Sequence, residues 1–286
     1  MLSILIPTYN YNILPLVNEI QKQCLEGGIE FEILCIDDAS DYFSNENQEI
    51  NNLKNCYYFV NDKNSGRTYT RNKLAEKASF DWLLFLDADV IPTHSNFIKN
   101  YVSAINKKHQ VIVGGYCYQE TKPKSENIFR YQYGKEREEK SALKRNSAPY
   151  QYIFSGNFLI QKKIFIDVNF TGEGNYYGMD VFFSCQLFVK KIEVLHIENP
   201  IYHLGLETNQ IFFEKSLKAV ESRKRFLANC PGIEKISPLI KKYKTIKQYR
   251  LLPIAILFFK ISEPFLKKLI LNKNPNLFCF DIYRLG

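Results

Sequence analysis

Several features that would assign this chain to a familiar class are missing from its sequence. The cysteines contain no C-x-x-C pair, and no zinc site is predicted. No G-x-G-x-x-G motif follows the first apolar run and no G-K-[ST] motif occurs, which argues against a nicotinamide cofactor and against a P-loop. The uncharged apolar run before Lys260 is far shorter than the ~20 residues that a membrane-spanning helix needs.

The cysteines are odd in number and scattered along the chain. They stand at positions 24, 35, 56, 117, 185, 230 and 279, several of them inside apolar runs. This distribution predicts reduced, mostly buried thiols in a cytosolic protein.

The composition is that of a globular protein with a basic balance. The 286 residues are 45% hydrophobic and 24% charged, enough for one large domain or for one domain with a smaller appendage. The net charge of +8 suits an acidic partner such as nucleic acid, a nucleotide phosphate or an anionic membrane surface. Charge alone does not choose among these three.

The first third of the chain alternates between two periodicities. Continuous apolar runs, typical of strands buried on both faces, stand at 2–6, 31–36, 56–60 and 81–87. Helical spacing of apolar residues separates them at 13–25 and 66–79. Later strands are expected at 110–118 and 192–197, with a helix near 95–107. The predicted fold class is α/β, with a mostly parallel twisted sheet flanked by helices.

Two segments differ from this pattern. Residues 119–150 are highly charged, which predicts a mobile segment with one solvated helix around 134–146. The tail has a charged helix at 209–229 and then "LLPIAILFFKISEPFLKKLILNK" at 251–273. That apolar stretch with interspersed lysines predicts either an amphipathic segment on an anionic membrane surface or a helical pair packed on the domain.

Polar motifs follow the predicted strands, where ligands bind in a parallel sheet. They read "PTYN" at 7–10, "DDAS" at 37–40, "NDKNSGRT" at 61–68 and "DAD" at 87–89. In a strand, Asp87 and Asp89 would point to one face, and a divalent cation with oxygen ligands would relieve their repulsion. The alternative is a capping or turn role, because Asp is a frequent loop residue.

The remaining strand ends offer groups that suit a nucleotide. An aromatic ring at Tyr9 could stack on a base, and a carboxylate after the second strand could accept a hydrogen bond from a base or a ribose. Arg67 and Arg71 lie one helical turn apart, and arginine suits contact with phosphate, although one of the two could be an ordinary surface charge.

Taken in order, these motifs resemble those of family 2 glycosyltransferases with the GT-A-type fold. The resemblance runs from "SILIPTYN" through "CIDDAS", "NSGRTYTRN" and "WLLFLDADV" to "GNFLI", "GMDVFFSCQL" and "NPIYHLGLE", covering roughly residues 1–207. The ending "FDIYRLG" resembles the ends of members from bacterial surface-polysaccharide clusters. The resemblance implies a catalytic domain at 1–207, with a Rossmann-like nucleotide-binding part at 1–118 and an acceptor part at 119–207. A helical, amphipathic extension at 208–286 would follow.

The resemblance also implies roles for individual residues. Tyr9 would stack on uracil, Asp38 would hydrogen-bond it with Asp37 as helper or strand cap, and Asp87 would face the ribose. Asp89 would bind the metal, and His203 is either a further metal ligand or a structural residue. The remaining nucleotide contacts would come from Pro7, Thr8, Asn10, Asn64, Gly66, Arg67, Arg71 and Ala88.

Asp180 would be the general base that accepts the proton of the acceptor hydroxyl. In inverting members the base usually follows a glutamate, and here the pair reads Met179-Asp180. A helix N-terminus favours Asp for structural reasons as well. Sugar or acceptor contacts are implied for Gly156, Asn157, Gly178 and Met179.

The sequence therefore predicts an inverting transferase that moves a sugar from a nucleoside diphosphate donor, with UDP favoured, to a hydroxyl of a glycan or lipid-linked acceptor. The implied cofactor is Mn²⁺ or Mg²⁺, and no nucleic acid partner is expected. The implied location is cytoplasmic, with peripheral contact at the inner face of an anionic membrane. The alternatives are a sugar-nucleotide-binding protein without transfer activity and a nucleotidyltransferase, although "PTYNYNILP" lacks the glycine-rich basic loop usual in the latter.

Overall fold

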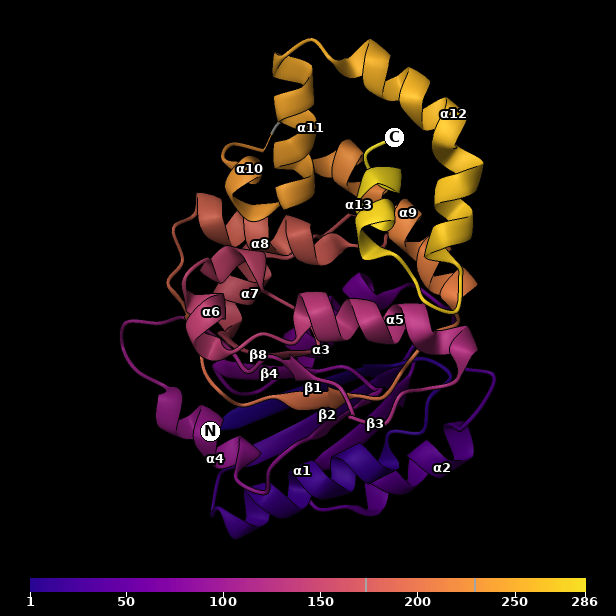
Figure 1. Ribbon diagram of the computed structural model, residues 1–286. Helices are drawn as coiled ribbons and strands as arrows, with labels where there is room; N and C mark the ends of the chain where they lie inside the picture. Colours follow the sequence, from indigo (N-terminus) through magenta and orange to yellow (C-terminus); the bar gives the residue numbers. More distant parts are fainter. Residues whose placement is uncertain (173, 229) are drawn as a thin grey trace.

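A seven-stranded sheet lies at the centre of the computed structural model, which describes residues 1–172, 174–228 and 230–286 (Figure 1). Its strand order is β3-β2-β1-β4-β8-β6-β9. The strands are β1 Leu2–Thr8, β2 Phe31–Asp37, β3 Cys56–Val60, β4 Trp82–Leu86, β6 Val111–Val113, β8 Asn157–Gln161 and β9 Val194–His196. Strands β3, β2, β1 and β4 run parallel, and β8 runs antiparallel to both of its neighbours. The mostly parallel sheet predicted from the sequence is confirmed.

Alternating side chains of the strands build two cores. Ile4, Ile6 and Leu84 belong to the cluster on one face, whereas Leu5 and Phe85 belong to the cluster on the other. Both sets are fully buried because helices cover both faces, so the strands read as continuous apolar runs.

Helices from different parts of the chain cover the two faces (Figure 1). One face carries α1 Leu14–Glu26 and α4 Phe97–Ala104. The other carries α3 Arg67–Lys77, α7 Lys162–Val168 and α8 Met179–Val189. The short α2 Ser44–Gln48 and a 3₁₀ turn at Glu49–Asn52 connect β2 to β3.

A second, three-stranded sheet has the order β5-β10-β7. Its strands are β5 Val90–Pro92, β7 Tyr116–Cys117 and β10 Ile201–His203. The antiparallel pairing of β10 with β5 sets His203 opposite Val90, the residue after Asp89. This small sheet therefore carries a histidine from late in the chain to the acidic motif.

The charged segment 119–150 is packed against the domain, so the prediction of a mobile segment with one solvated helix is wrong. It forms a 3₁₀ turn Ser125–Asn127, α5 Ile128–Tyr133, a π-helical turn Gly134–Glu138, α6 Ala142–Asn146 and a 3₁₀ turn Pro149–Gln151. Arg145 is fully buried, and its guanidinium donates hydrogen bonds to carbonyls of Lys140, Val113, Gly114 and Ile197 at 2.8–3.2 Å. A buried arginine with this many backbone acceptors anchors the segment.

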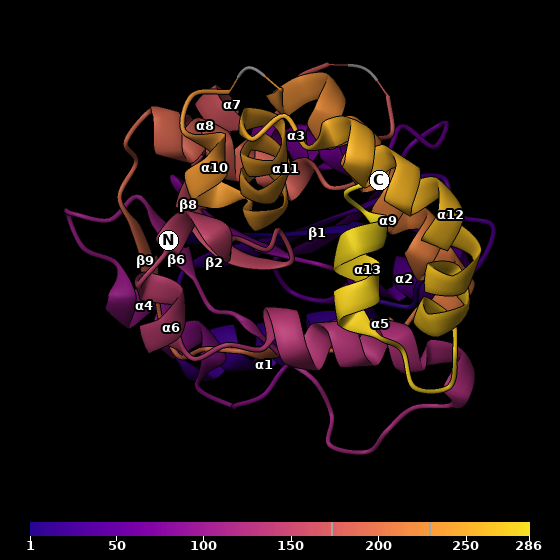
Figure 2. The same ribbon diagram turned by 45° about the horizontal axis from the view of Figure 1, so that its top comes forward.

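The C-terminal helices lie over α5 and α8, as Figure 2 shows. They are α9 Asn209–Leu227, α10 Ile233–Ile236, α11 Pro238–Gln248, α12 Leu252–Ile270 and α13 Leu277–Tyr283. Phe213, Leu266 and Phe280 share one small core with Phe129 of α5, and Leu227 and Ile233 share another with Cys185 of α8. In the described parts of the chain, no helix has both the length and the apolar character required to cross a bilayer.

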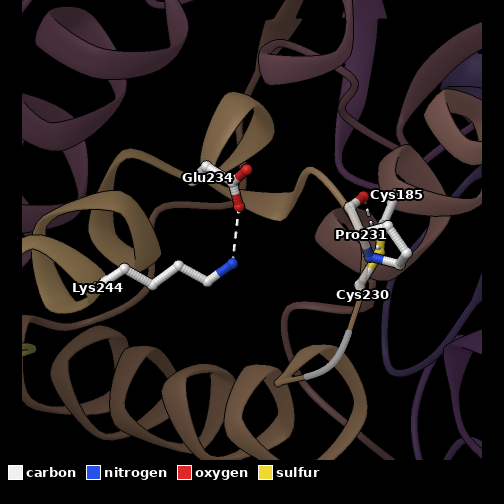
Figure 3. Close-up of a disulfide and its surroundings, with 5 residues drawn as sticks. All are labelled: Cys185, Cys230, Pro231, Glu234 and Lys244. Atoms are coloured by element: carbon white, nitrogen blue, oxygen red, sulfur yellow. Dashed lines mark hydrogen bonds and ion pairs between the residues drawn. A yellow bond between two sulfur atoms is a disulfide. The ribbon is translucent and has the colours of Figure 1, made fainter. Parts of the chain in front are cut away.

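Cys185 in α8 and Cys230 after α9 form a disulfide (Figure 3). The expectation that all cysteines are reduced is therefore wrong for this pair. The two positions are 45 residues apart in sequence and meet only because α8 packs against the turn before α10. Cys24, Cys35, Cys56, Cys117 and Cys279 are free thiols, and burial raises the pKa of Cys24 to about 12.

Candidate active site

A cavity of about 510 Å³ lies where β1, β2 and β4 end. It collects most of the residues that the sequence singled out. These are Pro7, Thr8, Tyr9, Asp38, Asn64, Gly66, Arg67, Arg71, Asp87, Ala88, Asp89, Gly178, Met179, Asp180 and His203. Segments more than a hundred residues apart in the chain thus share one site.

Asp38 fixes the loop that borders the cavity after β3. Its Oδ1 accepts hydrogen bonds from Asn61 Nδ2 at 2.9 Å and from the Ser65 amide at 3.0 Å, and its Oδ2 accepts one from the Gly66 amide at 2.7 Å. Gly66 has φ +90°, and a Cβ there would lie 3.0 Å from Asn175, so this position favours glycine. Asp38 therefore joins the end of β2 to the start of α3.

Asp37 and Asn10 lie behind the cavity lining. Asp37 is fully buried and accepts hydrogen bonds from the Ser40 amide at 2.8 Å, from Ser44 Oγ at 3.3 Å and from the Tyr58 hydroxyl. Asn10 Oδ1 accepts a hydrogen bond from the Asp41 amide at 2.8 Å. Asp37 therefore has the capping role, one of the two expected for it, and Asn10 links two strand-end loops.

Asp87 and Arg71 form a buried ion pair at the floor of the cavity. Arg71 Nη2 lies 2.6 Å from Asp87 Oδ1, and the two side chains are only 7% and 9% exposed. Burial would raise the pKa of Asp87, but the guanidiniums of Arg67 and Arg71 outweigh it and hold that pKa below its usual value. Two residues expected to contact the nucleotide thus contact each other.

Asp89 and His203 face each other across the neighbouring edge. His203 Nε2 lies 3.8 Å from Asp89 Oδ2, and the Leu204 amide donates a hydrogen bond to the Asp89 carbonyl at 2.8 Å. A Cβ at Gly205 would collide with the Asp89 carboxylate, so the glycine is required for this approach. Burial lowers the pKa of His203 in spite of Asp89, which favours the neutral imidazole that a metal requires.

The pair alone is not a complete metal site. Among the described residues, no group of three or more His, Cys, Asp or Glu side chains is placed to hold a metal. The Asp89 carboxylate is the ligand type that suits Mg²⁺ and Mn²⁺, and substrate phosphates and water usually complete the coordination of these ions.

Asp180 stands in the first turn of α8, after Gly178 and Met179 at the helix start. Gly178 adopts φ +75°, and a Cβ there would lie 2.7 Å from Cβ of Ala219 in α9. In the described parts of the chain, the Asp180 carboxylate has no side-chain hydrogen bond within the protein. The helix dipole favours an anion at this position, and no side chain of the described residues competes with a ligand for the Asp180 carboxylate.

Gly156 and Asn157 lie outside the cavity lining, contrary to their expected contact with sugar or acceptor. Asn157 is fully buried, accepting a hydrogen bond from Tyr101 Oη at 2.7 Å and donating one to the Gly115 carbonyl at 2.8 Å. The Gly156 carbonyl accepts a hydrogen bond from the Asp87 amide at 3.2 Å, and a Cβ at Gly156 would collide with the Asp87 carboxylate. Both residues support the site from behind.

The sequence did not indicate the second wall of the cavity. It is lined by Arg130, Tyr133 and Glu138 from the charged segment and by Phe212, Lys215, Arg223 and Arg284 from the C-terminal part. Arg130 pairs with Glu138 at 2.9 Å. The expected boundary at residue 207 therefore does not separate the site from the extension. The arginines, lysine and glutamate of this wall stand among many other charged residues, so no sequence pattern distinguished them.

Comparisons with known proteins agree with this geometry. Residues 3–168 match the family model described as Glycosyl transferase family 2. No curated protein sequence matches the chain.

Solved structures with a similar fold extend the comparison. The crystal structure of S. aureus TarS 1-349 is 19% identical, with a TM-score of 0.53, over 77% of this chain and 64% of that one. The mannosyltransferase PcManGT from Pyrobaculum calidifontis is 12% identical, with a TM-score of 0.59, over 99% of this chain and 84% of that one. Glucosyl-3-phosphoglycerate synthase from Mycobacterium tuberculosis is 13% identical, with a TM-score of 0.54, over 79% and 80%. The chain thus spans less than two thirds of the TarS chain.

At these identities the solved structures show the GT-A fold, and the family model covers more than half of the chain. The chain belongs to glycosyl transferase family 2.

Proposed function

We propose that this family 2 member is a glycosyltransferase that moves a sugar from a nucleoside diphosphate donor to a hydroxyl of a glycan or lipid-linked acceptor, with inversion at the anomeric carbon. One observation carries the proposal: a single cavity is lined by the strand-end residues Tyr9, Asp38 and Asp89 and by Asp180 from the start of α8. The residues proposed to bind the nucleotide and the residue proposed as general base therefore line the same cavity. The bacterial surface-polysaccharide resemblance of the tail makes a surface glycan the favoured product.

The sheet rim would hold the nucleotide. The Tyr9 side chain is 49% exposed and presents a ring on which a base can stack. Asp38 borders the same space, and Arg67 is exposed at its edge, where it can reach a diphosphate. Uridine is favoured over guanosine by the family resemblance.

Asp89 and His203 would hold a divalent cation together with the donor's phosphates. The buried Nδ1 of His203 has no hydrogen-bond partner in the described residues, and its Nε2 already points to Asp89. When bound, Mn²⁺ or Mg²⁺ would stabilise negative charge on the departing diphosphate.

Asp180 would act as the general base. The acceptor oxygen forms the new bond to the anomeric carbon as the bond from that carbon to the diphosphate oxygen breaks. The nucleoside diphosphate leaves with the electron pair, and the hydroxyl proton passes to the Asp180 carboxylate. A single displacement of this kind inverts the anomeric configuration, and positioning both substrates in one cavity supplies the orientation.

The known complexes support a donor and a metal of this kind. TarS 1-349 has been solved with UDP-GlcNAc, PcManGT with GDP-Man and Mn²⁺, and glucosyl-3-phosphoglycerate synthase with Mn²⁺ and UDP. They leave the choice of base, sugar and acceptor to experiment.

A thermal-shift screen of UDP-, GDP- and dTDP-sugars with and without Mn²⁺ tests the donor site. The matching donor at a hundred times its dissociation constant should stabilise the fold by about 2.7 kcal/mol. Asp89→Asn should remove the Mn²⁺-dependent part of that gain, whereas Asp62→Asn, in the loop after β3 but outside the cavity lining, should retain it. An unchanged Mn²⁺ effect in Asp89→Asn would contradict the metal assignment. The anomeric configuration of the product, measured by NMR, tests inversion.

We also propose that α12 contacts an anionic membrane surface. Ile254, Leu257, Ile261 and Phe265 follow helical spacing on one exposed face, with Ile261 74% and Phe265 64% exposed. Leu266 and Ile270 bury the opposite face. Exposed lysines of α12 would meet anionic head groups beside this apolar stripe, as in interfacial helices.

Sedimentation with phosphatidylglycerol vesicles tests the membrane contact. Ile261→Glu should weaken binding by about tenfold or more, because one buried isoleucine contributes roughly 2 kcal/mol. The matched control Val102→Glu, on α4, should bind as the parent does. Equal binding of Ile261→Glu and the parent would argue for a surface without a membrane role.

A further inference from the structure

A second cavity of about 500 Å³ adjoins the first. Gly178, Asp180, Tyr133, Glu138, Arg223 and Arg284 line both. The proposed base therefore stands at the junction, with the strand-end residues on one side and the second cavity on the other. Because the donor is expected at the strand ends, the second cavity is open to the acceptor.

Two arginines at this junction lack sufficient counter-charge. Arg223 of α9 forms no hydrogen bond and no ion pair in the described parts of the chain, and its Nε is buried without a partner. Arg284, after α13, pairs with Asp281 at 2.5 Å, but its Nε is also buried and unpaired. Asp281 additionally pairs with Arg137 at 3.0 Å, so one carboxylate serves two guanidiniums.

The remaining neighbours do not neutralise the pair. Two acids line both cavities, Asp180 and Glu138. Glu138 is already paired with Arg130 at 2.9 Å and accepts a hydrogen bond from the Tyr118 hydroxyl. Arg284 packs its guanidinium against the ring of Phe280, 4.2 Å from the centroid, which fixes its orientation without neutralising it. Burial lowers the pKa of Arg223, and the nearby Arg284 lowers it further, although the Asp180 carboxylate acts against both; the net shift is downward, so Asp180 does not offset burial and the second cation.

Buried N–H groups without acceptors cost free energy, and two nearby cations repel each other. A phosphate between them would satisfy both demands, because guanidinium groups match phosphate oxygens in charge and in geometry. We infer that Arg223 and Arg284 form a phosphate subsite for the acceptor, so that the acceptor carries a phosphate ester close to the hydroxyl that receives the sugar. This inference rests on the proposed transfer reaction and specifies its acceptor.

The phosphate ester has two sources with the same chemistry. It is either part of a lipid-linked glycan or part of a water-soluble sugar phosphate. The second cavity is lined by Tyr150, Tyr152 and Phe154, which offer an apolar surface beyond the arginines. An alkyl chain attached to the phosphate would use that surface, whereas a small ester would not.

Calorimetric titration of the full chain, held at saturating UDP, tests the subsite with inorganic phosphate, methyl phosphate and decyl phosphate. The parent should bind phosphate with UDP present, and Arg223→Gln should weaken that binding by about tenfold or more. The matched control Lys224→Gln removes the same charge from the next, exposed residue of α9 and should bind as the parent does. Tighter binding of decyl than of methyl phosphate would identify a lipid-linked acceptor, and equal binding a water-soluble one.

Stability separates a binding role from a structural one. Because Arg223 has no protein partner, Arg223→Gln without phosphate should unfold at a temperature no lower than the parent's, and only the phosphate-dependent gain should disappear. Arg284→Gln gives a second reading if it folds. The inference is overturned if the parent binds no phosphate, if Arg223→Gln binds it normally, or if Arg223→Gln weakens UDP as strongly as phosphate. Failure of UDP to bind the parent would instead overturn the proposed donor, whatever the phosphate titration shows.

Discussion

The cavity has a sheet wall, formed by the residues at the strand ends, and a helical wall, formed by the charged segment and the C-terminal helices. The two walls differ in how far their polar side chains are paired within the protein. On the sheet wall, the polar groups that define the site are already bound to one another: Asp38 accepts three hydrogen bonds, and Asp87 is paired with Arg71. On the helical wall, Arg223 and Arg284 retain buried N–H groups without acceptors. In the described residues the sheet wall also leaves Arg71 Nε and His203 Nδ1 without a partner, but each of these residues keeps an acidic neighbour, whereas Arg223 has no hydrogen bond or ion pair at all.

The difference indicates how each wall is used. Preorganised groups bind a ligand without reorganisation, which suits a nucleotide that is the same in every turnover. Unsatisfied cations gain a partner only when an anion binds, so by our inference the second wall gains stability from the phosphate of the acceptor. Substituting Asp180, where the two walls meet, should have the largest effect on transfer, and substitutions elsewhere should have smaller effects.

Asp180→Asn should abolish most transfer while leaving both walls intact. Loss of a general base reduces turnover by about a thousandfold, and the isosteric amide preserves the shape of the junction. Turnover of the matching donor and acceptor measures the loss, and UDP titration should give the parent's affinity. Full turnover in this variant would remove Asp180 from the mechanism.

Arg71→Met should disrupt the sheet wall and destabilise the fold by about 3–5 kcal/mol, because Asp87 would remain as an uncompensated buried charge. Urea unfolding measures the change. Arg67→Met is the matched control: Arg67 is 64% exposed and 3.9 Å from Asp87, so its loss should cost less than about 1 kcal/mol. Equal costs for the two variants would show that the sheet wall is not preorganised as described.

A histidine contribution to the pH dependence of stability should come from His196, away from both walls, in addition to that of His203. This buried imidazole lies 2.9 Å by Nε2 from the Pro149 carbonyl and 3.2 Å by Nδ1 from Arg145 Nη1, contacts that require a neutral ring donating through Nε2. Burial lowers the pKa of His196 from 6.5 to about 4. The unfolded chain therefore binds the proton first, and stability should fall by roughly 3 kcal/mol as pH drops from about 6.5 to about 4.

Urea midpoints across that pH interval measure this fall. His196→Gln, which can still donate and accept, should flatten the profile, whereas the exposed His109→Gln should leave it unchanged. A profile that keeps its slope in His196→Gln would place the titrating group elsewhere.

Gly205→Ala adds only one methyl group, next to Asp89, the proposed metal ligand of the sheet wall. The new Cβ would displace the Asp89 carboxylate, and a displacement of about 1 Å costs about a hundredfold in rate. Steady-state turnover with varied Mn²⁺ should show the loss. Gly28→Ala is the control: its Cβ meets nothing within 4 Å, and although φ +61° makes the variant about 1 kcal/mol less stable, it should turn over normally.

The sheet wall could be predicted from sequence because it depends on local patterns. Continuous apolar runs marked β1, β2, β3 and β4, and strand ends in a parallel sheet meet at one edge, so Tyr9, Asp38 and Asp89 were placed together without coordinates. The charge-rich segment was misread because a charged residue is usually solvated, whereas Arg145 is buried among carbonyls that only the fold brings to it.

The helical wall could not be predicted because it depends on contacts between distant segments. Arg223 and Arg284 stand among many lysines and arginines of the last eighty residues or so and have no local motif. The reverse holds for Asn157. Its motif predicted a place in the site, but its side chain is hydrogen-bonded to Tyr101 and to the Gly115 carbonyl instead. The Cys185–Cys230 pair likewise follows from the packing of α8 on the turn before α10, not from cysteine spacing.

The close approach of Gly178 to Ala219 has an evolutionary consequence. With 2.7 Å between a Cβ at position 178 and that of Ala219, and with φ +75° at position 178, neither position can grow unless the other shrinks or α9 moves. Across related sequences, the two positions should therefore covary, with a side chain at 178 tolerated only beside glycine at 219. Substitution in α9 is in this way limited by the loop that precedes Asp180, the proposed base, so a position of the C-terminal part is constrained by the geometry of the cavity.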